Sequence, residues 1–162
     1  MDIVKELGHL CLATRLKRIG DRLQSDVQRL IDAREYPLMA NQYPILAAID
    51  RAGPMTIGDI SRSLGVSQPG VTRSVNALGR NGIVRFESPA EDRRRKVVAL
   101  SRLGQKIVDS SKSTLWPAIE AELVAICGDT GNSLLRHLDT LETELSKNPL
   151  SSRVDERPQE EA

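Results

Sequence analysis

Residues 55–100 read MTIGDISRSLGVSQPGVTRSVNALGRNGIVRFESPAEDRRRKVVAL: two short helical patterns joined by a tight turn, then a hairpin with a basic tip. Eight Lys and Arg residues face four Asp and Glu residues here, so the local net charge is +4. The whole chain has a net charge of +1, so the rest sums to −3. Because the positive charge is concentrated in one small unit, we expect that unit to face a polyanion.

The first half of this stretch predicts two helices, over residues 57–64 and 68–80. Thr56 and Ser67 stand where N-cap residues are expected. Gly65 lies between the helices and allows a sharp turn with positive φ. The pattern therefore predicts a helix-turn-helix.

The helix predicted over 68–80 has two different faces. Val71, Val75 and Leu78 share one face, and polar side chains occupy the opposite one. Amides can bond adenine edges, guanidinium groups can bond guanine or phosphate, and a Thr methyl can touch thymine. We interpret it as a helix for the DNA major groove, with the candidate contact residues Ser67, Gln68, Pro69, Thr72, Arg73, Asn76 and Arg80.

The second half predicts two strands, over 83–87 and 96–100, joined by a charged loop. Four consecutive cations would repel one another on a free surface, whereas Arg side chains favour the negative potential of a narrow minor groove. An acidic neighbour can orient an Arg through a charge-assisted hydrogen bond. The candidate wing residues are Asp92, Arg93, Arg94, Arg95 and Lys96.

Long helical patterns flank this unit. Residues 2–34 predict one helix with an apolar stripe, and residues 41–51 a second, with Asn41 as its N-cap. Residues 102–126 predict a helix kinked at Pro117, and 132–146 a last helix. These stripes exceed what a winged helix of about 60 residues can cover, so we expect the long helices to dimerise. Residues 148–162 lack hydrophobic spacing and predict a disordered acidic tail.

Composition excludes several classes of protein. Aromatic residues are scarce, so the core must be aliphatic, which favours packed helices. No apolar run is long enough to span a membrane, and the charged N-terminus is not a secretory signal, so we expect a cytoplasmic protein. No metal-ligand spacing, Gly-rich phosphate loop or nucleophile–base pair is present, so neither a cofactor nor enzymatic activity is expected.

The combined pattern resembles the multiple-antibiotic-resistance regulator (MarR) family. The resemblance rests on four segments: Ser67-x4-Thr72-Arg73-x-Val75-x2-Leu78, Asn81-Gly82-Ile83-Val84, Asp92-Arg93-Arg94 and Val98-Ala99-Leu100-Ser101-x2-Gly104. It implies a mainly α, winged helix-turn-helix homodimer whose two recognition helices enter successive major grooves of a pseudo-palindromic operator, with Arg94 in the minor groove. Residues 1–147 would form one domain, with a DNA-binding lobe over 41–100. Gly79 departs from the family pattern, which often has an acidic residue there or nearby.

The resemblance also implies a repressor that is released by a small aromatic or lipophilic effector. The candidate pocket residues are His9, Cys11, Arg15, Tyr36, Tyr43 and Trp116, which could equally be core or interface residues. Cys11 fits loosely with the peroxide-sensing branch of the family, in which Cys127 would be a resolving partner. The alternatives are therefore a thiol-based peroxide sensor, and a winged-helix module that binds protein rather than DNA.

Overall fold

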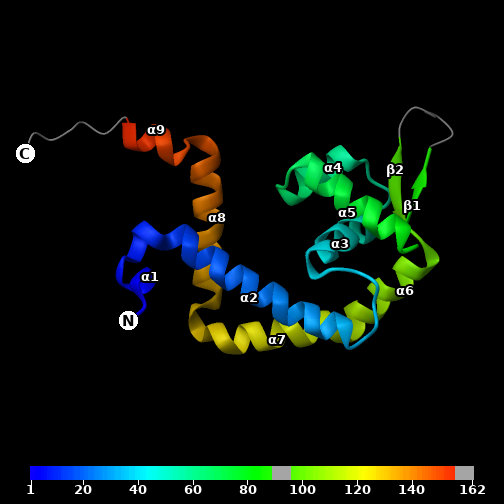
Figure 1. The fold of residues 1–162 in the computed structure, drawn as a ribbon, viewed down its shortest axis with the longest axis horizontal. Helices are drawn as coiled ribbons and strands as arrows, with labels where there is room; N and C mark the ends of the chain where they lie inside the picture. The colour runs from blue at the N-terminus through cyan, green and yellow to red at the C-terminus, as the bar shows by residue number, and fades with distance from the viewer. Residues whose placement is uncertain (89–95, 156–162) are drawn as a thin grey trace, which may run out of the picture. The chain divides into compact units, whose positions relative to one another are not determined.

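The computed structural model describes residues 1–88 and 96–155, and it divides into two compact units. The first unit comprises Met1–Pro117 and the second begins at Ala118. Figure 1 shows the helices and strands of both units along the chain. No helix in the described part of the chain is long and apolar enough to cross a membrane.

The N-terminal helix is shorter than predicted. The expected helix over 2–34 is divided into α1 (Ile3–Glu6), the 3-10 turn η1 (Gly8–Cys11) and α2 (Leu12–Asp32). The break lies at Gly8, whose φ of +54° is incompatible with a continuous right-handed helix. The apolar stripe of α2 remains, and most of its large side chains are exposed within the single chain.

The predicted helix over 41–51 begins later than expected, and Asn41 is not its cap. Ala40–Gln42 form the 3-10 turn η2, and α3 spans Tyr43–Ala52. The buried Gln42 stands at the N-cap position of α3 without a side-chain capping bond, and its Oε1 accepts from Met39 N at 2.8 Å at the start of η2. Pro44 then occupies the first turn of α3, where its missing N–H costs little.

The two helices of the helix-turn-helix match the prediction: α4 spans Ile57–Leu64 and α5 spans Gln68–Arg80. Thr56 caps α4 through a capping box, in which its Oγ1 accepts from Asp59 N at 3.1 Å. Gly65 ends α4 in the left-handed region at φ +63°. Ser67 has the extended backbone of an N-cap, but its side chain makes no capping hydrogen bond.

The predicted hairpin is present, and one residue outside it also pairs with its second strand. β1 (Val84–Glu87) pairs antiparallel with β2 (Val97–Leu100), with Val84 opposite Leu100. Met55, just before α4, forms an isolated antiparallel bridge with Val98 through Met55 N to Val98 O (3.0 Å) and Val98 N to Met55 O (2.7 Å). This bridge ties the hairpin to the chain segment that enters the helix-turn-helix.

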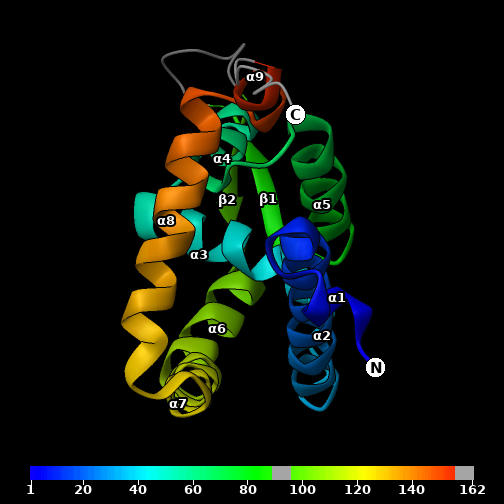
Figure 2. The same ribbon diagram turned by 90° about the vertical axis from the view of Figure 1, so that its left-hand side faces the viewer.

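The core of the first unit lies where α3, α4, α5, the hairpin and α6 (Arg102–Ser110) meet (Figures 1 and 2). It is aliphatic, as predicted. Its fully buried side chains include Leu46, Ile60, Val71, Val75, Leu78, Ile83, Val98 and Val108. Gly104 brings α6 against the hairpin, because a Cβ added there would lie 2.1 Å from the Ile83 carbonyl oxygen.

The helix predicted over 102–126 is irregular just before Pro117. A five-residue π-helical turn, Ser111–Leu115, joins α6 to α7 (Trp116–Cys127). Pro117 lacks an N–H and so removes one rung of the helical ladder, and the preceding turn widens. Within this turn the Thr114 hydroxyl donates to Ser110 O at 2.8 Å.

The second unit consists of helices without a buried core. It contains most of α7, the 3-10 turn η4 (Gly128–Thr130), α8 (Gly131–Lys147) and α9 (Leu150–Asp155). None of the described residues from 118 to 155 is buried.

The short helix α9 corrects the expectation of disorder from residue 148 onward. Arg153 holds this segment in place by donating to the carbonyl oxygens of Asn148 and Glu144, both at 2.8 Å, and to the Glu144 carboxylate at 2.9 Å. This partner lowers the pKa of Glu144. The remaining tail, residues 156–162, lies outside the described residues.

Candidate nucleic-acid interface

The helix α5 is held on the first unit by its apolar back. Val71, Val75 and Leu78 are at most 1% exposed and recur at spacings of four and three, so one face of α5 is fixed against the core. The turn before it is tight: Val66 N bonds Ser61 O at 3.2 Å, and Ser61 Oγ donates to Val66 O at 2.6 Å. The opposite face of α5 is thereby presented on a rigid support.

Most of the predicted contact residues lie on this outward face. Ser67, Gln68, Pro69, Arg73, Asn76 and Arg80 are all exposed. Arg73, Asn76 and Arg80 follow one another at spacings of three and four, so they form a polar stripe that runs along α5. Amide and guanidinium groups in such a stripe can reach base edges and phosphates.

Thr72 is placed differently from the residues beside it. It is half-buried, and its hydroxyl donates to Gln68 O within the same helix at 2.9 Å. The hydroxyl proton is therefore occupied, which leaves the γ-methyl group and the oxygen lone pairs for an outside partner. A contact by Thr72 would thus be apolar, or would use Thr72 as an acceptor.

The structure describes only part of the predicted wing. Asp92, Arg93, Arg94 and Arg95 lie outside the described residues, and Lys96 is exposed at the start of the second strand.

At the base of the hairpin, Arg85 and Glu87 share one face of β1, and Arg85 Nε bonds Glu87 Oε1 at 2.6 Å. Arg85 also donates to the carbonyl oxygen of Leu100. The single carboxylate on this described strand is therefore paired with a cation.

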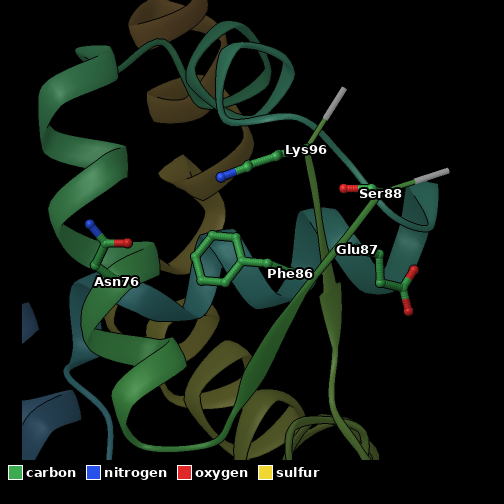
Figure 3. Close-up of a pocket in the computed structure, with 5 residues that line it drawn as sticks. All are labelled: Asn76, Phe86, Glu87, Ser88 and Lys96. Carbon is green, nitrogen blue, oxygen red and sulfur yellow. The ribbon is translucent and has the colours of Figure 1, made fainter. Parts of the chain in front are cut away.

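An open notch separates α5 from the hairpin. It has a volume of about 490 Å³ and is lined by Asn76, Phe86, Glu87, Ser88 and Lys96. Phe86, Ser88 and Lys96 point toward α5, whereas the Glu87 carboxylate points away (Figure 3). The sequence prediction did not include Phe86 or Ser88 among the site residues. The available signal was an apolar side chain at an outward position of a strand, where 48% of it is exposed.

The predicted effector residues fall into two groups. Tyr36 donates to Ser110 Oγ at 2.8 Å, Tyr43 Oη lies 3.1 Å from Ser111 Oγ, and the rings of Tyr43 and Trp116 meet edge-on with centroids 5.9 Å apart. Burial of Tyr43 raises the pKa of its hydroxyl. These three aromatic residues thus gather around the π turn. The pairing serines were not expected from the sequence.

His9 and Cys11 belong to η1, which packs against α1 and α2, and Arg15 is half-buried on α2. No interaction joins these three residues to the aromatic group within the part of the chain that the structure describes. Cys11 and Cys127 are both free thiols and half-buried.

The arrangement of α4, α5 and a hairpin over a helical core defines a winged helix-turn-helix protein. The family model described as "MarR family" matches residues 36–95. The uncharacterized HTH-type transcriptional regulator YwoH of Bacillus subtilis is 31% identical over 103 residues, which cover 64% of this chain and 74% of YwoH. The chain belongs to the MarR family, a family of transcriptional regulators and not of enzymes.

Two further proteins are informative. The transcriptional activatory protein BadR of Rhodopseudomonas palustris is 27% identical over 118 residues, which cover 71% of this chain and 65% of BadR. The crystal structure of the S. aureus MepR–DNA complex aligns with a TM-score of 0.68 at 21% identity, covering 83% of this chain and 96% of the MepR chain. The second alignment confirms the predicted fold.

Proposed function

We propose that this MarR-family regulator is a homodimeric repressor that binds a pseudo-palindromic operator in double-stranded DNA. The observation that carries the proposal is the polar stripe of α5, Arg73–Asn76–Arg80, mounted on a fully buried apolar back. Among the described residues no carboxylate forms an ion pair with Arg73 or Arg80, so both cations are available for a polyanion. The similarity to a regulator solved as a DNA complex supports the same use of α5.

Dimerisation is supported by the apolar surface of the helices outside the lobe. Leu134, Leu135, Leu141 and Leu145 on α8 are between 37% and 61% exposed in the single chain. Leu134, Leu141 and Leu145 recur at spacings of seven and four and so share one face of α8, and an exposed apolar face of this kind is typical of an interaction site. A second copy of the chain would cover it and would place two α5 helices about 34 Å apart, the distance of one DNA turn.

The test is selection of bound sequences from a random DNA pool, followed by light scattering of the complex. The proposal predicts an enriched inverted repeat with half-sites about one helical turn apart, bound by two chains. An enriched single half-site, a monomer mass at micromolar concentration, or no enrichment would contradict it.

Whether the protein represses or activates transcription can be tested with the selected operator. A reporter assay with the selected operator placed over a promoter is expected to show higher expression when the regulator is absent. Lower expression would assign the protein to activation, the role named for BadR.

We further propose that the effector is a small aromatic or lipophilic compound that binds beside Tyr36, Tyr43 and Trp116. These side chains combine aromatic faces with hydroxyl groups, which suits a compact aromatic ligand. Trp116 is the only tryptophan of the chain, so its fluorescence reports directly on this region. Titration with salicylate should change Trp116 emission and release DNA at the same concentration. DNA release without a change in emission would place the effector elsewhere.

The peroxide-sensing alternative has its own test. Operator binding would be measured before and after cumene hydroperoxide, in the wild type and in Cys11→Ser. Loss of binding in the wild type alone would support a sensor that uses Cys11. An unchanged wild type, or an equal loss in both proteins, would remove that alternative.

A further inference from the structure

We infer that the notch between α5 and the hairpin holds one sugar–phosphate strand of the operator, with Phe86 as its apolar floor and Lys96 as its phosphate contact. This inference rests on the proposed binding of DNA. It assigns a role to Phe86, Ser88 and Gly79, which the sequence pattern left without one.

Groove geometry gives the first argument. When a recognition helix lies in the major groove and a hairpin reaches the adjacent minor groove, one backbone strand separates the two grooves. That strand must pass between the helix and the hairpin. The notch lies at this place, between Asn76 on α5 and the hairpin residues Phe86, Ser88 and Lys96 (Figure 3).

The chemistry of the hairpin face gives the second argument. Successive strand residues alternate between faces, so Val84, Phe86 and Ser88 share the face toward α5. The last strand pair is Glu87 with Val97, and Ser88 and Lys96 are the residues next to that pair. The face therefore changes from buried aliphatic at its base, through an exposed ring, to a hydroxyl and an ammonium group at its outer end. A deoxyribose with its phosphate has the same order of apolar and anionic parts.

The charged side chains around the notch also favour an anionic ligand. The Glu87 carboxylate lies on the other face and pairs with Arg85. Lys96 is exposed beside the notch, and Arg73 and Arg80 extend from α5 on either side of Asn76. A backbone strand in the notch would thus meet Lys96 on the hairpin side and the polar stripe of α5 on the other, and cationic and amide groups are the usual phosphate contacts.

Gly79 accounts for the position of the ring. A Cβ added to Gly79 would lie 3.2 Å from Phe86 Cε2, so the absence of a side chain lets the ring edge approach α5 closely. The departure from the family pattern at this position is therefore matched by Phe86 across the notch. A Cβ at 79 would require the half-exposed ring to shift by a few tenths of an ångström, toward the proposed path of the strand.

The principal test compares Phe86→Ala and Leu103→Ala in titrations with the selected operator at several salt concentrations. Leu103 is a matched control, because it is similarly exposed (43%) but lies on α6. We expect Phe86→Ala to weaken binding about tenfold with an unchanged salt slope, because the lost contact is apolar. Leu103→Ala should bind like the wild type. Binding by Phe86→Ala within about twofold of the wild type would overturn the inference.

Lys96→Gln tests the other part of the notch. It should lower the magnitude of the salt slope by about two for the dimer, since one phosphate contact is lost in each half-site. Operators in which single phosphates are replaced by neutral methylphosphonates locate that contact. One replacement in each half-site should weaken the wild type and leave Lys96→Gln unaffected. Identical replacement profiles for the two proteins would contradict the assignment.

Gly79→Ala gives an independent check that does not truncate the ring. Alanine favours the helix, so the melting temperature should be maintained or raised while operator affinity falls. In the double variant with Phe86→Ala the affinity should fall no further than with Phe86→Ala alone, because both changes act on one ring. Additive losses would overturn the inference. If the wild type selects no DNA, the proposed function is wrong. If the wild type binds the operator and all three variants bind it equally well, only the role assigned to the notch is wrong.

Discussion

The two units of this chain use the same aliphatic residues in opposite ways. In the first unit most leucines, isoleucines and valines from α3 to the π-helical turn are enclosed, whereas those of α2 are mostly exposed, and every described buried residue of the chain lies between Ile31 and Leu115. In the described part of the second unit no residue is buried, and Val124, Ile126 and Leu135 are more than 60% exposed.

This difference suggests that the first unit can fold by itself, whereas the second depends on assembly with a partner. Burying one large aliphatic side chain contributes about 1.5–3 kcal/mol, so the lobe around α3–α6 can be stable by itself. Helices α7–α9 gain no such contribution within one chain. In the proposed dimer, helices of a second copy would cover these side chains and stabilise α7–α9.

The largest expected effect comes from Leu141→Asp on α8. A carboxylate in the proposed dimer interface would lose its hydration, and we expect the dimer dissociation constant to rise about 100-fold, which is roughly 3 kcal/mol. Sedimentation equilibrium would measure it. The control is Thr143→Asp, which introduces the same charge about 200° around the helix. Equal dissociation constants for the two variants would disprove that this face of α8 is the interface.

Gly104→Ala should instead damage the lobe and leave the interface intact. The added methyl would collide with the Ile83 carbonyl group, and we expect a loss of about 3 kcal/mol in the free energy of unfolding. Urea denaturation would measure this loss. Gly20→Ala is the matched control, because open space surrounds Gly20 within α2 and alanine should stabilise that helix. Similar stabilities for the two variants would show that the α6–hairpin contact is not tight.

The two N-caps of the helix-turn-helix offer a smaller, graded comparison. Thr56→Ala removes a capping box and should destabilise the lobe by about 1–2 kcal/mol. Ser67→Ala removes a side chain that makes no capping bond, and we expect only a few tenths of a kcal/mol. Chemical denaturation of both variants would test the ranking. A reversed order would mean that Ser67 caps α5 in solution.

The smallest expected effect is a loss of stability at acidic pH. The Lys112 ammonium, 2.9 Å from Asp50, and the Gln105 amide hold the pKa of Asp50 below its ordinary value. A lowered pKa means that the contribution to stability is present at neutral pH and is lost as the pH falls below about 4.

Because the pair is partly exposed, the contribution to stability should be under about 1 kcal/mol. The difference in unfolding free energy between wild type and Asp50→Asn should shrink between pH 6 and pH 3. A difference that is constant over this range would exclude an electrostatic origin.

The sequence predicted the lobe well because its signals are local. Gly65, Thr56 and the spacing of Val71, Val75 and Leu78 each act within one or two turns of chain, and α4 and α5 follow from them. The helix α9 was missed because its apolar pattern is too short, and Arg153, which anchors it, gives no periodic signal.

The site was less predictable because it depends on contacts between distant residues. Tyr36 and Tyr43 pair with serines about 70 positions away, and Phe86 gains its place only when β1 lies against α5. No periodicity encodes such pairings. The outward face of α5, in contrast, was readable because a single helix carries it.

The bridge between Met55 and Val98 has a consequence for the edge of the hairpin. At Val98, β2 pairs with Phe86 of β1 on one side and with Met55 on the other. An unpaired strand edge can recruit a strand of another chain. Because Met55 occupies the backbone N–H and carbonyl group of Val98, β2 offers no such edge at this position.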